Sequence, residues 1–161
     1  MTSLTVRRAG AEESDAVAVL FRLCKETSLP YLPDLHTREE DRAFFRERVF
    51  TTCEVWVAED DGALAGFCAF RAGWVDHLYV HPKHERKGIG AALLRTAMAS
   101  NAEVRLWTFL RNTNARAFYE AQGFRCAQTT DGRDNEEHEP DALYVWSACN
   151  EEGEASASPS R

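Results

Sequence analysis

Two closely spaced glycines follow an apolar, strand-like run in the middle of the chain. Gly88 and Gly90 occur in the segment LYVHPKHERKGIGAALL, which spans residues 78–94. A glycine has no side chain, so a ligand can approach the backbone closely there. The N–H groups of Arg86 to Ala91 would converge at the start of a helix, which favours a phosphate or pyrophosphate group. The segment predicts a phosphate-binding loop; a glycine turn that binds no ligand is the alternative.

The spacing of this loop does not fit the two common nucleotide motifs. The dinucleotide fingerprint GxGxxG fails because Leu93 occupies the position of its last glycine. The P-loop requires a lysine directly after a glycine, whereas Lys87 precedes Gly88. A second motif, NTNARAFYEAQGF, lies further along the chain at residues 112–124.

Both segments resemble motifs of the GNAT superfamily of N-acetyltransferases. In that family a strand of the form L-x-V-x-P precedes a loop written [QR]-x-x-G-x-[GA]. Here residues 78–82 read LYVHP and residues 85–90 read ERKGIG, so Glu85 departs from the pattern at the first loop position. The family's next helix carries N-x-x-A-x-x-F-Y-E-x-x-G-F, which residues 112–124 match in full.

The resemblance implies a mixed α/β (α+β) GNAT-like fold over about residues 3–148. Its sheet would have six to seven strands, flanked by about four helices and splayed between the fourth and fifth strands. Acetyl-CoA would lie in that splay as a co-substrate, with no metal. The implied cofactor-binding residues are Leu78, Tyr79, Val80, Arg86, Lys87, Gly88, Ile89, Gly90, Ala91 and Asn112.

The resemblance also implies catalytic roles. The N–H of Leu78 would donate to the thioester oxygen, and this bond would strengthen as negative charge develops there. Tyr119 would protonate the departing CoA thiolate, because a phenol with an ordinary pKa of about 10 is protonated at pH 7. Asp76 and His77 are the first candidates for the general base, and Glu54 is another. Since Asp76 and His77 are adjacent on a strand, they should face opposite sides of the sheet.

Two segments are candidates for the acceptor side. In relatives, the bend between the first two helices overhangs the acceptor, and here it contributes Tyr31 and His36. The loop between the last two strands, residues 131–141, holds six acidic residues and one arginine, with Glu136 and Glu137 among the candidates. An aromatic ring and carboxylates suit an ammonium group, so a cationic amine is the expected acceptor. A solvated acidic insert without a role is the alternative.

Hydrophobic periodicity and turn signals predict the elements that would position these residues. A helix is expected over residues 11–26, with an apolar face formed by Ala16, Val19, Leu20 and Leu23. Thr37 and Glu40 form a capping box that opens a second helix to about residue 50. Further helices are expected at residues 91–99 and 112–122. Strands are expected at residues 4–8, 53–59, 63–72, 74–80, 104–110, 124–130 and 142–146, with a hairpin turn at residues 60–62.

Composition limits the class of protein. The 161 residues carry a net charge of −7, concentrated in the 131–141 loop and in residues 151–161, while the rest of the chain is neutral. A nucleic-acid binder needs a basic face, which this distribution argues against. One domain over residues 1–150 and a disordered acidic tail over 151–161 are expected. No run of residues is long and apolar enough to span a membrane, and no signal peptide is recognised, so a cytoplasmic protein is expected.

The five cysteines and the neighbouring histidines predict no metal or disulfide. The cysteines are widely spaced without a CxxC pair, so buried free thiols are expected. His77, His81 and His84 span a strand end and a loop interrupted by Pro82, which does not match a metal-binding helix face.

Two functional hypotheses follow. The first is an acetyl-CoA-dependent N-acetyltransferase that acts on a small-molecule or peptide amine by direct attack in a ternary complex, with a homodimer as one option for its assembly. The second is a non-catalytic acyl-CoA-binding or regulatory domain of the same fold, or a transferase of a different acyl group. Tyr119 and Asn112 at their motif positions favour the enzyme.

Overall fold

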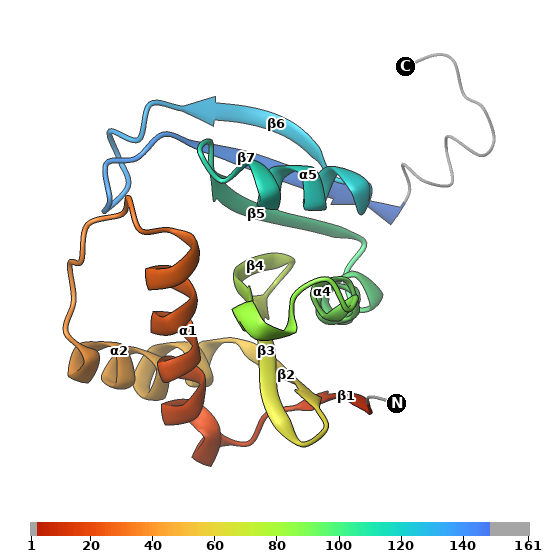
Figure 1. Ribbon diagram of the computed structural model, residues 1–161. Helices are drawn as coiled ribbons and strands as arrows, with labels where there is room; N and C mark the ends of the chain where they lie inside the picture. The colour runs from red at the N-terminus through yellow and green to blue at the C-terminus, as the bar shows by residue number, and fades with distance from the viewer. Residues whose placement is uncertain (1–2, 149–161) are drawn as a thin grey trace. The chain divides into compact units, whose positions relative to one another are not determined.

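The computed structural model describes residues 3–148, which fall into two compact units (Figure 1). The first unit contains the residues up to Arg71 and those from Val75 to Thr96, and the second contains Ala72–Trp74 and the residues from Ala97 onward. The predicted tail at residues 151–161 and Cys149 lie outside the described residues. The single domain over residues 1–150 stays a prediction.

The strands of the first unit form an antiparallel meander. They are β1 (Leu4–Arg8), β2 (Glu54–Asp60), β3 (Ala63–Arg71) and β4 (Trp74–Val80), the last of which begins in the second unit. The β2–β3 register pairs Val57 with Phe67. Asp61 and Gly62 form the hairpin turn with φ of 52° and 83°, as a two-residue turn of the I′ type requires. The predicted hairpin is confirmed.

Helices come from three stretches that lie in the first unit, except that α4 ends in the second unit. The bounds are η1 (Ala11–Glu13), α1 (Ser14–Ser28), α2 (Arg38–Phe44), η2 (Phe45–Val49), α3 (Phe50–Thr52), η3 (Pro82–His84) and α4 (Ile89–Ala99). The predicted capping box is present at the start of α2. The Thr37 hydroxyl accepts from the Glu40 N–H at 3.1 Å, and the Glu40 carboxylate accepts from the Thr37 N–H at 2.8 Å.

The apolar face predicted for α1 is wrong in part. Leu20 is buried as expected, but Val19 is 57% exposed and Leu23 is 38% exposed. The side that packs inward also contains the buried Arg22. A charged residue argues against a core-facing position, but Arg22 is paired there with acidic side chains, so the helix can turn this side toward the core.

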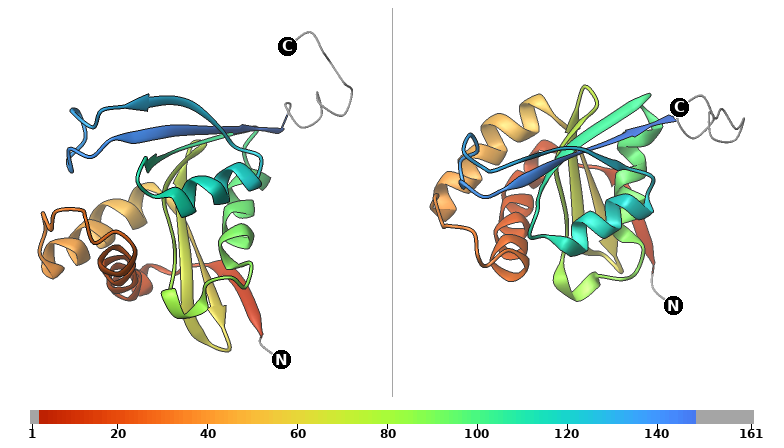
Figure 2. Two further views of the ribbon diagram at one scale, coloured as in Figure 1. Left: turned by 45° about the horizontal axis from the view of Figure 1, so that its top comes forward. Right: turned by 90° about the horizontal axis from the view of Figure 1, so that it is seen from above.

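The core of the first unit lies between the helices α1–α3 and the sheet. It is formed by Val17, Ala18, Leu20, Cys24, Phe45, Val49, Val55, Val57, Phe67 and Ala69. The two views of Figure 2 place α1 and α2 on one side of strands β2–β4 and α4 on the other. Gly66 allows α4 to approach, because a Cβ atom there would lie 2.9 Å from the Tyr79 carbonyl oxygen and 3.1 Å from Leu93 Cδ1.

Replacing Gly66 by valine should therefore destabilise the protein by about 2 kcal/mol, because the added side chain meets backbone that cannot move aside. Since α4 would be pushed away from β3, the loop before α4 should shift as well. Urea denaturation measures the loss. Ala63→Val, at the exposed start of the same strand, is the control and should change stability by no more than about 0.5 kcal/mol. Equal effects of the two changes would contradict the close packing at Gly66.

The second unit is a three-stranded sheet with one helix. Its elements are β5 (Glu103–Phe109), α5 (Thr113–Ala121), β6 (Arg125–Thr130) and β7 (Asp141–Ser147). β7 pairs antiparallel with both β5 and β6. Within this unit Trp74, the first residue of β4, pairs parallel with Arg105. The full order is β1-β2-β3-β4-β5-β7-β6, which confirms the predicted mixed sheet with seven strands. The predicted splay between β4 and β5 stays a prediction.

Candidate active site

The predicted phosphate loop joins β4 to α4 and is held at its start by two hydrogen bonds. The N–H of His81 donates to the carbonyl of Ala65 at 2.7 Å, and the N–H of Lys83 donates to Nδ1 of His81 at 3.0 Å. Gly88 has φ of 79°, and a Cβ atom there would meet nothing within 4 Å. Glycine is therefore needed at this position for its backbone conformation, and not to relieve crowding within the chain.

The backbone N–H groups at the end of the loop are available to a ligand. Within residues 3–148, those of Arg86 to Ala91 donate to no acceptor, and the first backbone hydrogen bond of the helix runs from the Ala92 N–H to the Gly88 carbonyl at 3.0 Å. The first N–H groups of a helix have no partner within the helix, and together they favour an anion. The backbone therefore fits the phosphate-binding role predicted for this loop.

The two basic side chains of the loop differ in their partners. Nζ of Lys87 lies 2.8 Å from Oδ2 of Asp60, the last residue of β2. Arg86 is exposed, and its guanidinium has no ion pair within the described part of the chain. Of the two cations predicted to bind the cofactor, Arg86 is thus the one without a carboxylate partner.

The base candidates on β4 point to opposite faces of the sheet, as predicted. The ring of His77 is surrounded by the rings of Phe21, Phe44, Phe45, Phe67 and Tyr79. Burial lowers the pKa of His77 to about 4, so its imidazole is neutral at pH 7. Oδ2 of Asp76 accepts from Nε of Arg71 at 2.7 Å. Asp76 is therefore tied to a cation, and His77 lies in an aromatic environment.

The low pKa of His77 predicts a loss of stability in mild acid. The unfolded chain binds the His77 proton at about pH 6.5, whereas the folded protein binds it near pH 4. This contribution is fully present above pH 6.5 and is lost as the pH falls toward 4. The slope can reach about 1.4 kcal/mol per pH unit. Denaturant unfolding of wild type and His77→Phe between pH 7.5 and 5 measures it. The variant should show the shallower slope, and identical slopes would contradict the prediction.

The other cofactor-binding candidates on β4 are only half-buried. Leu78 and Val80 share the face opposite His77 and Tyr79 along the strand. The Val80 carbonyl accepts from Sγ of Cys24 at 3.4 Å. Tyr79 packs against Phe67, with ring centroids 5.8 Å apart.

The second motif lies on α5 in the second unit. Oδ1 of Asn112 accepts from the Ala115 N–H at 3.2 Å, so this side chain caps the helix. Tyr119 is 8% exposed, and its ring packs against Phe124 with centroids 5.7 Å apart. Gly123 ends the helix with φ of 96°, as a C-terminal glycine does.

Comparisons with known proteins cover both motifs. Residues 51–126 match the family model of the acetyltransferase (GNAT) domain, and this range includes the loop before α4 and the whole of α5. This stretch, slightly less than half of the chain, is similar to the GNAT acetyltransferase domain. The acceptor-side candidates at residues 31, 36, 136 and 137 lie outside the matched range.

Two curated relatives agree with this assignment. The chain is 35% identical over 80 residues to peptidyl-lysine N-acetyltransferase YiaC of Escherichia coli, covering 49% of this chain and 55% of the relative. It is 35% identical over 79 residues to the probable N-acetyltransferase Rv2775 of Mycobacterium tuberculosis, covering 44% of this chain and 45% of the relative. The chain thus spans about half the length of the curated relatives it matches.

Solved structures show the same fold. Apo YjaB of Escherichia coli matches with a TM-score of 0.74 at 21% identity, covering 89% of this chain and 97% of that one. The PaiA N-acetyltransferase of Thermoplasma acidophilum, solved with coenzyme A, matches with a TM-score of 0.67 at 20% identity, covering 90% and 99%. The GNAT fold predicted from the motifs is confirmed.

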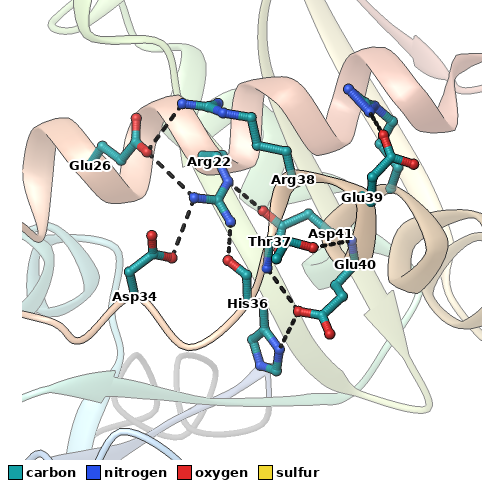
Figure 3. Close-up of polar contacts among 10 residues, drawn as sticks. Arg22, Glu26, Asp34, His36, Thr37, Arg38, Glu39, Glu40 and Asp41 are labelled. Atoms are coloured by element: carbon teal, nitrogen blue, oxygen red, sulfur yellow. Dashed lines mark hydrogen bonds and ion pairs between the residues drawn. The ribbon is translucent and has the colours of Figure 1, made fainter.

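The first acceptor candidates lie between α1 and α2, where a buried arginine organises the chain (Figure 3). Nε of Arg22 donates to Oδ2 of Asp41 at 2.7 Å, and Nη1 of Arg22 lies 3.3 Å from Oδ1 of Asp34. Nη2 of Arg22 donates to the backbone carbonyl of His36. His36 is exposed and Tyr31 is half-buried. Arg22 was not predicted; an arginine on a helix that precedes an acid-rich stretch is the signal that could have indicated it.

Two carboxylates of the acidic loop form hydrogen bonds within the protein. Glu139 is 9% exposed and accepts from the Arg111 guanidinium at 2.9 and 3.2 Å. Asp141 accepts from the Thr130 hydroxyl and, at 3.1 Å, from Nδ2 of Asn135. Glu136 is exposed and Glu137 is half-buried. The charge that this loop presents to solvent is therefore smaller than its composition indicates.

The expectation of buried free thiols is confirmed for Cys24 and Cys68 and is wrong for Cys126. Cys24, Cys53, Cys68 and Cys126 are free. Burial raises the pKa of Cys24 and of Cys68 to about 12, so both are inert. Cys126 is exposed, however, because β6 is an edge strand with little covering its side chains. Among residues 3–148, no three His, Cys, Asp or Glu side chains are arranged to hold a metal ion, and no helix is long and apolar enough to cross a membrane.

Proposed function

We propose that this chain transfers an acetyl group from acetyl-CoA to a primary amine by direct attack within a ternary complex. The observation that carries the proposal is the loop before α4. There, consecutive backbone N–H groups from Arg86 to Ala91 are open at a helix N-terminus, inside the stretch that matches the GNAT domain. That geometry suits the pyrophosphate of coenzyme A.

The residues of the first unit supply the proposed cofactor contacts. The N–H groups of the loop and the guanidinium of Arg86 would bind phosphate oxygens, and the backbone of Leu78 and Val80 would bind the pantetheine amides. Ile89 is buried and anchors the start of α4. Asn112 would serve the pantetheine arm indirectly by capping α5 and so fixing the start of that helix.

The reaction needs three actions from the protein. Acetyl-CoA supplies a thioester whose carbonyl carbon is open to nucleophilic attack. The amine nitrogen bonds to that carbon, the C–S bond breaks, and the amine loses one proton while the thiolate gains one. The N–H of Leu78 would stabilise the developing oxyanion. Tyr119 would protonate the thiolate.

The amine proton needs an acceptor, and Asp76 and His77 are the proposed bases. His77 is neutral at pH 7 and can accept a proton, whereas the Asp76 carboxylate is paired with Arg71. The pH–rate profiles of Asp76→Asn and His77→Phe separate the two. Only loss of the true base removes the acidic limb of kcat/KM.

The proposed acceptor is a cationic primary amine, either a small molecule or a lysine side chain of a peptide. Support comes from Tyr31 and His36 on the segment between α1 and α2, and from Glu136 and Glu137 on the acidic loop. YiaC is named for acting on peptidyl lysine. The free thiols fit a reducing compartment, so we propose the cytoplasm as the site of action.

Release of CoA thiol from acetyl-CoA across a panel of amines tests the proposal. The panel should contain polyamines, amino sugars and lysine peptides, with mass spectrometry of each product. We expect acetylation of at least one primary amine, at a rate far above hydrolysis. Thermal stabilisation by CoA is the binding control. Stabilisation without turnover of any amine would favour a non-catalytic acyl-CoA-binding domain, and turnover only with a longer acyl-CoA would identify a different acyl donor.

A further inference from the structure

A buried carboxylate connects the end of β2 to the phosphate loop. Asp60 is 4% exposed, and its Oδ2 lies 2.9 Å from Nδ1 of His84 and 2.8 Å from Nζ of Lys87. These two partners lie 24 and 27 residues further along the chain. Lys87 and His84 together hold the pKa of the Asp60 carboxyl below its ordinary value. The carboxylate is therefore ionised and bound to both sides of one turn.

The turn between these partners is strained. His84 and Lys87 bracket Glu85 and Arg86, and Arg86 has φ of 67°, in the left-handed region that non-glycine residues rarely adopt. Such a residue costs on the order of 1 kcal/mol and persists only where its surroundings hold it. Asp60 supplies that hold, because it binds the residue before and the residue after the strained pair.

A contribution to folding stability does not by itself explain the presence of a carboxylate at position 60. Its second oxygen, Oδ1, is buried and has no hydrogen-bond partner within residues 3–148. A buried carboxylate with one unsatisfied oxygen is unfavourable for folding compared with an apolar residue. The cost is understandable if the carboxylate orders a functional loop.

We propose that Asp60 is a positioning residue for the phosphates of acetyl-CoA. It fixes the turn at Arg86, so that the N–H groups of residues 86–91 point to one place, and it keeps the ammonium of Lys87 away from the phosphates. The backbone and Arg86 then provide the phosphate contacts, and Lys87 acts through the loop. The identity of the ligand in this inference rests on the proposed function. The ordering of the loop by Asp60 does not depend on it.

The loop ordering can be tested without a ligand by limited trypsin digestion. Lys83, Arg86 and Lys87 are exposed cleavage sites in the loop. In Asp60→Asn, which keeps the shape of the side chain and removes its charge, we expect cleavage in the loop to be about tenfold faster than in wild type. The matched control is Asp61→Asn, a neighbour with the same charge change whose side chain accepts from the Ser3 N–H and not from the loop. It should be cleaved at the wild-type rate. Equal cleavage of the two variants would overturn the inference.

Calorimetric titration with CoA tests the ligand half of the inference, which is that Asp60 supports the binding of CoA. Asp60→Asn should raise the Kd for CoA about tenfold, and Asp61→Asn should leave it unchanged. If wild type itself does not bind CoA, the proposed function fails, and so does the ligand half of the inference, while the digestion still decides whether Asp60 orders the loop. If wild type binds CoA and Asp60→Asn binds it equally well, the proposed function stands and the inference is overturned.

The salt dependence of CoA binding distinguishes a direct contact of Lys87 with the phosphates from an indirect role through the loop. This test does not require the Asp60→Asn variant to fold. Arg86→Met should reduce the dependence of log Kd on log salt concentration, because it removes a cation that meets phosphate. Lys87→Met should weaken binding with the salt dependence unchanged, since its charge is already paired. A reduced salt dependence in Lys87→Met, equal to that of Arg86→Met, would place Lys87 on the phosphates and overturn the inference.

Discussion

Replacing Tyr119 by phenylalanine is expected to lower kcat by about a hundredfold or more while changing KM for acetyl-CoA little. A positioned proton donor contributes about 10²- to 10⁴-fold to the rate of such a step. The change removes only the hydroxyl. The ring of Tyr119 is buried beside Phe118 and Phe124, and phenylalanine preserves that packing. Steady-state kinetics with detection of released thiol measure both constants.

A second buried tyrosine of the same unit provides the control. Tyr144 is fully buried; its hydroxyl donates to Glu120 at 2.8 Å and accepts from Nε of Arg116 at 3.0 Å. Tyr144→Phe should cost about 1 to 2 kcal/mol of stability through these lost bonds and leave kcat at the wild-type value. Wild-type turnover in Tyr119→Phe would remove Tyr119 from the mechanism. An equal loss of kcat in both variants would point to a general disturbance of the unit.

Replacing Arg22 by methionine is expected to lower the free energy of unfolding by about 3 kcal/mol or more. The side chains of Arg22 and Asp41 are each only 10% exposed, so the change leaves a buried carboxylate without its cation. The segment between α1 and α2 also loses the bonds to Asp34 and to the His36 carbonyl (Figure 3). Urea denaturation at pH 7 measures the loss.

Arg42→Met is the matched control for this prediction. Arg42 pairs with Glu39 at 2.7 Å, but the Glu39 side chain is 86% exposed, so the loss should stay below about 1 kcal/mol. The double variant Arg22→Met/Asp41→Leu should recover part of the stability, because an apolar pair no longer leaves a charge buried. If Arg22→Met were no more destabilising than Arg42→Met, the cluster around Arg22 would not hold the segment.

Local features of this protein could be predicted from the sequence by itself. The capping box of Thr37 and Glu40 and the turn at Asp61 and Gly62 are found where their residue types indicate. The helix start at Asn112 also agrees. In each case the interacting groups are within four residues of one another, so backbone geometry alone brings them together. The two motifs that resemble the GNAT family are local in the same sense.

Long-range pairings were decided only by the tertiary structure. Asp60 meets His84 and Lys87 because the β2–β3 hairpin ends beside the loop that follows β4, and no spacing in the sequence indicates this. Likewise, Arg111 neutralises Glu139 across 28 residues and so removes one charge from the acidic loop.

The orientation of α1 was decided in the same way. The pattern of apolar residues allows more than one face to turn inward, and the face that does so includes Arg22, because Asp41 on another helix satisfies its charge. The sequence thus indicated the fold, the glycine turn before α4 and the helix ends through motifs and contacts between near neighbours. Which charged side chains are paired and which remain open to a ligand depended on how distant segments pack together, since a buried charge is stable only where the fold supplies its partner.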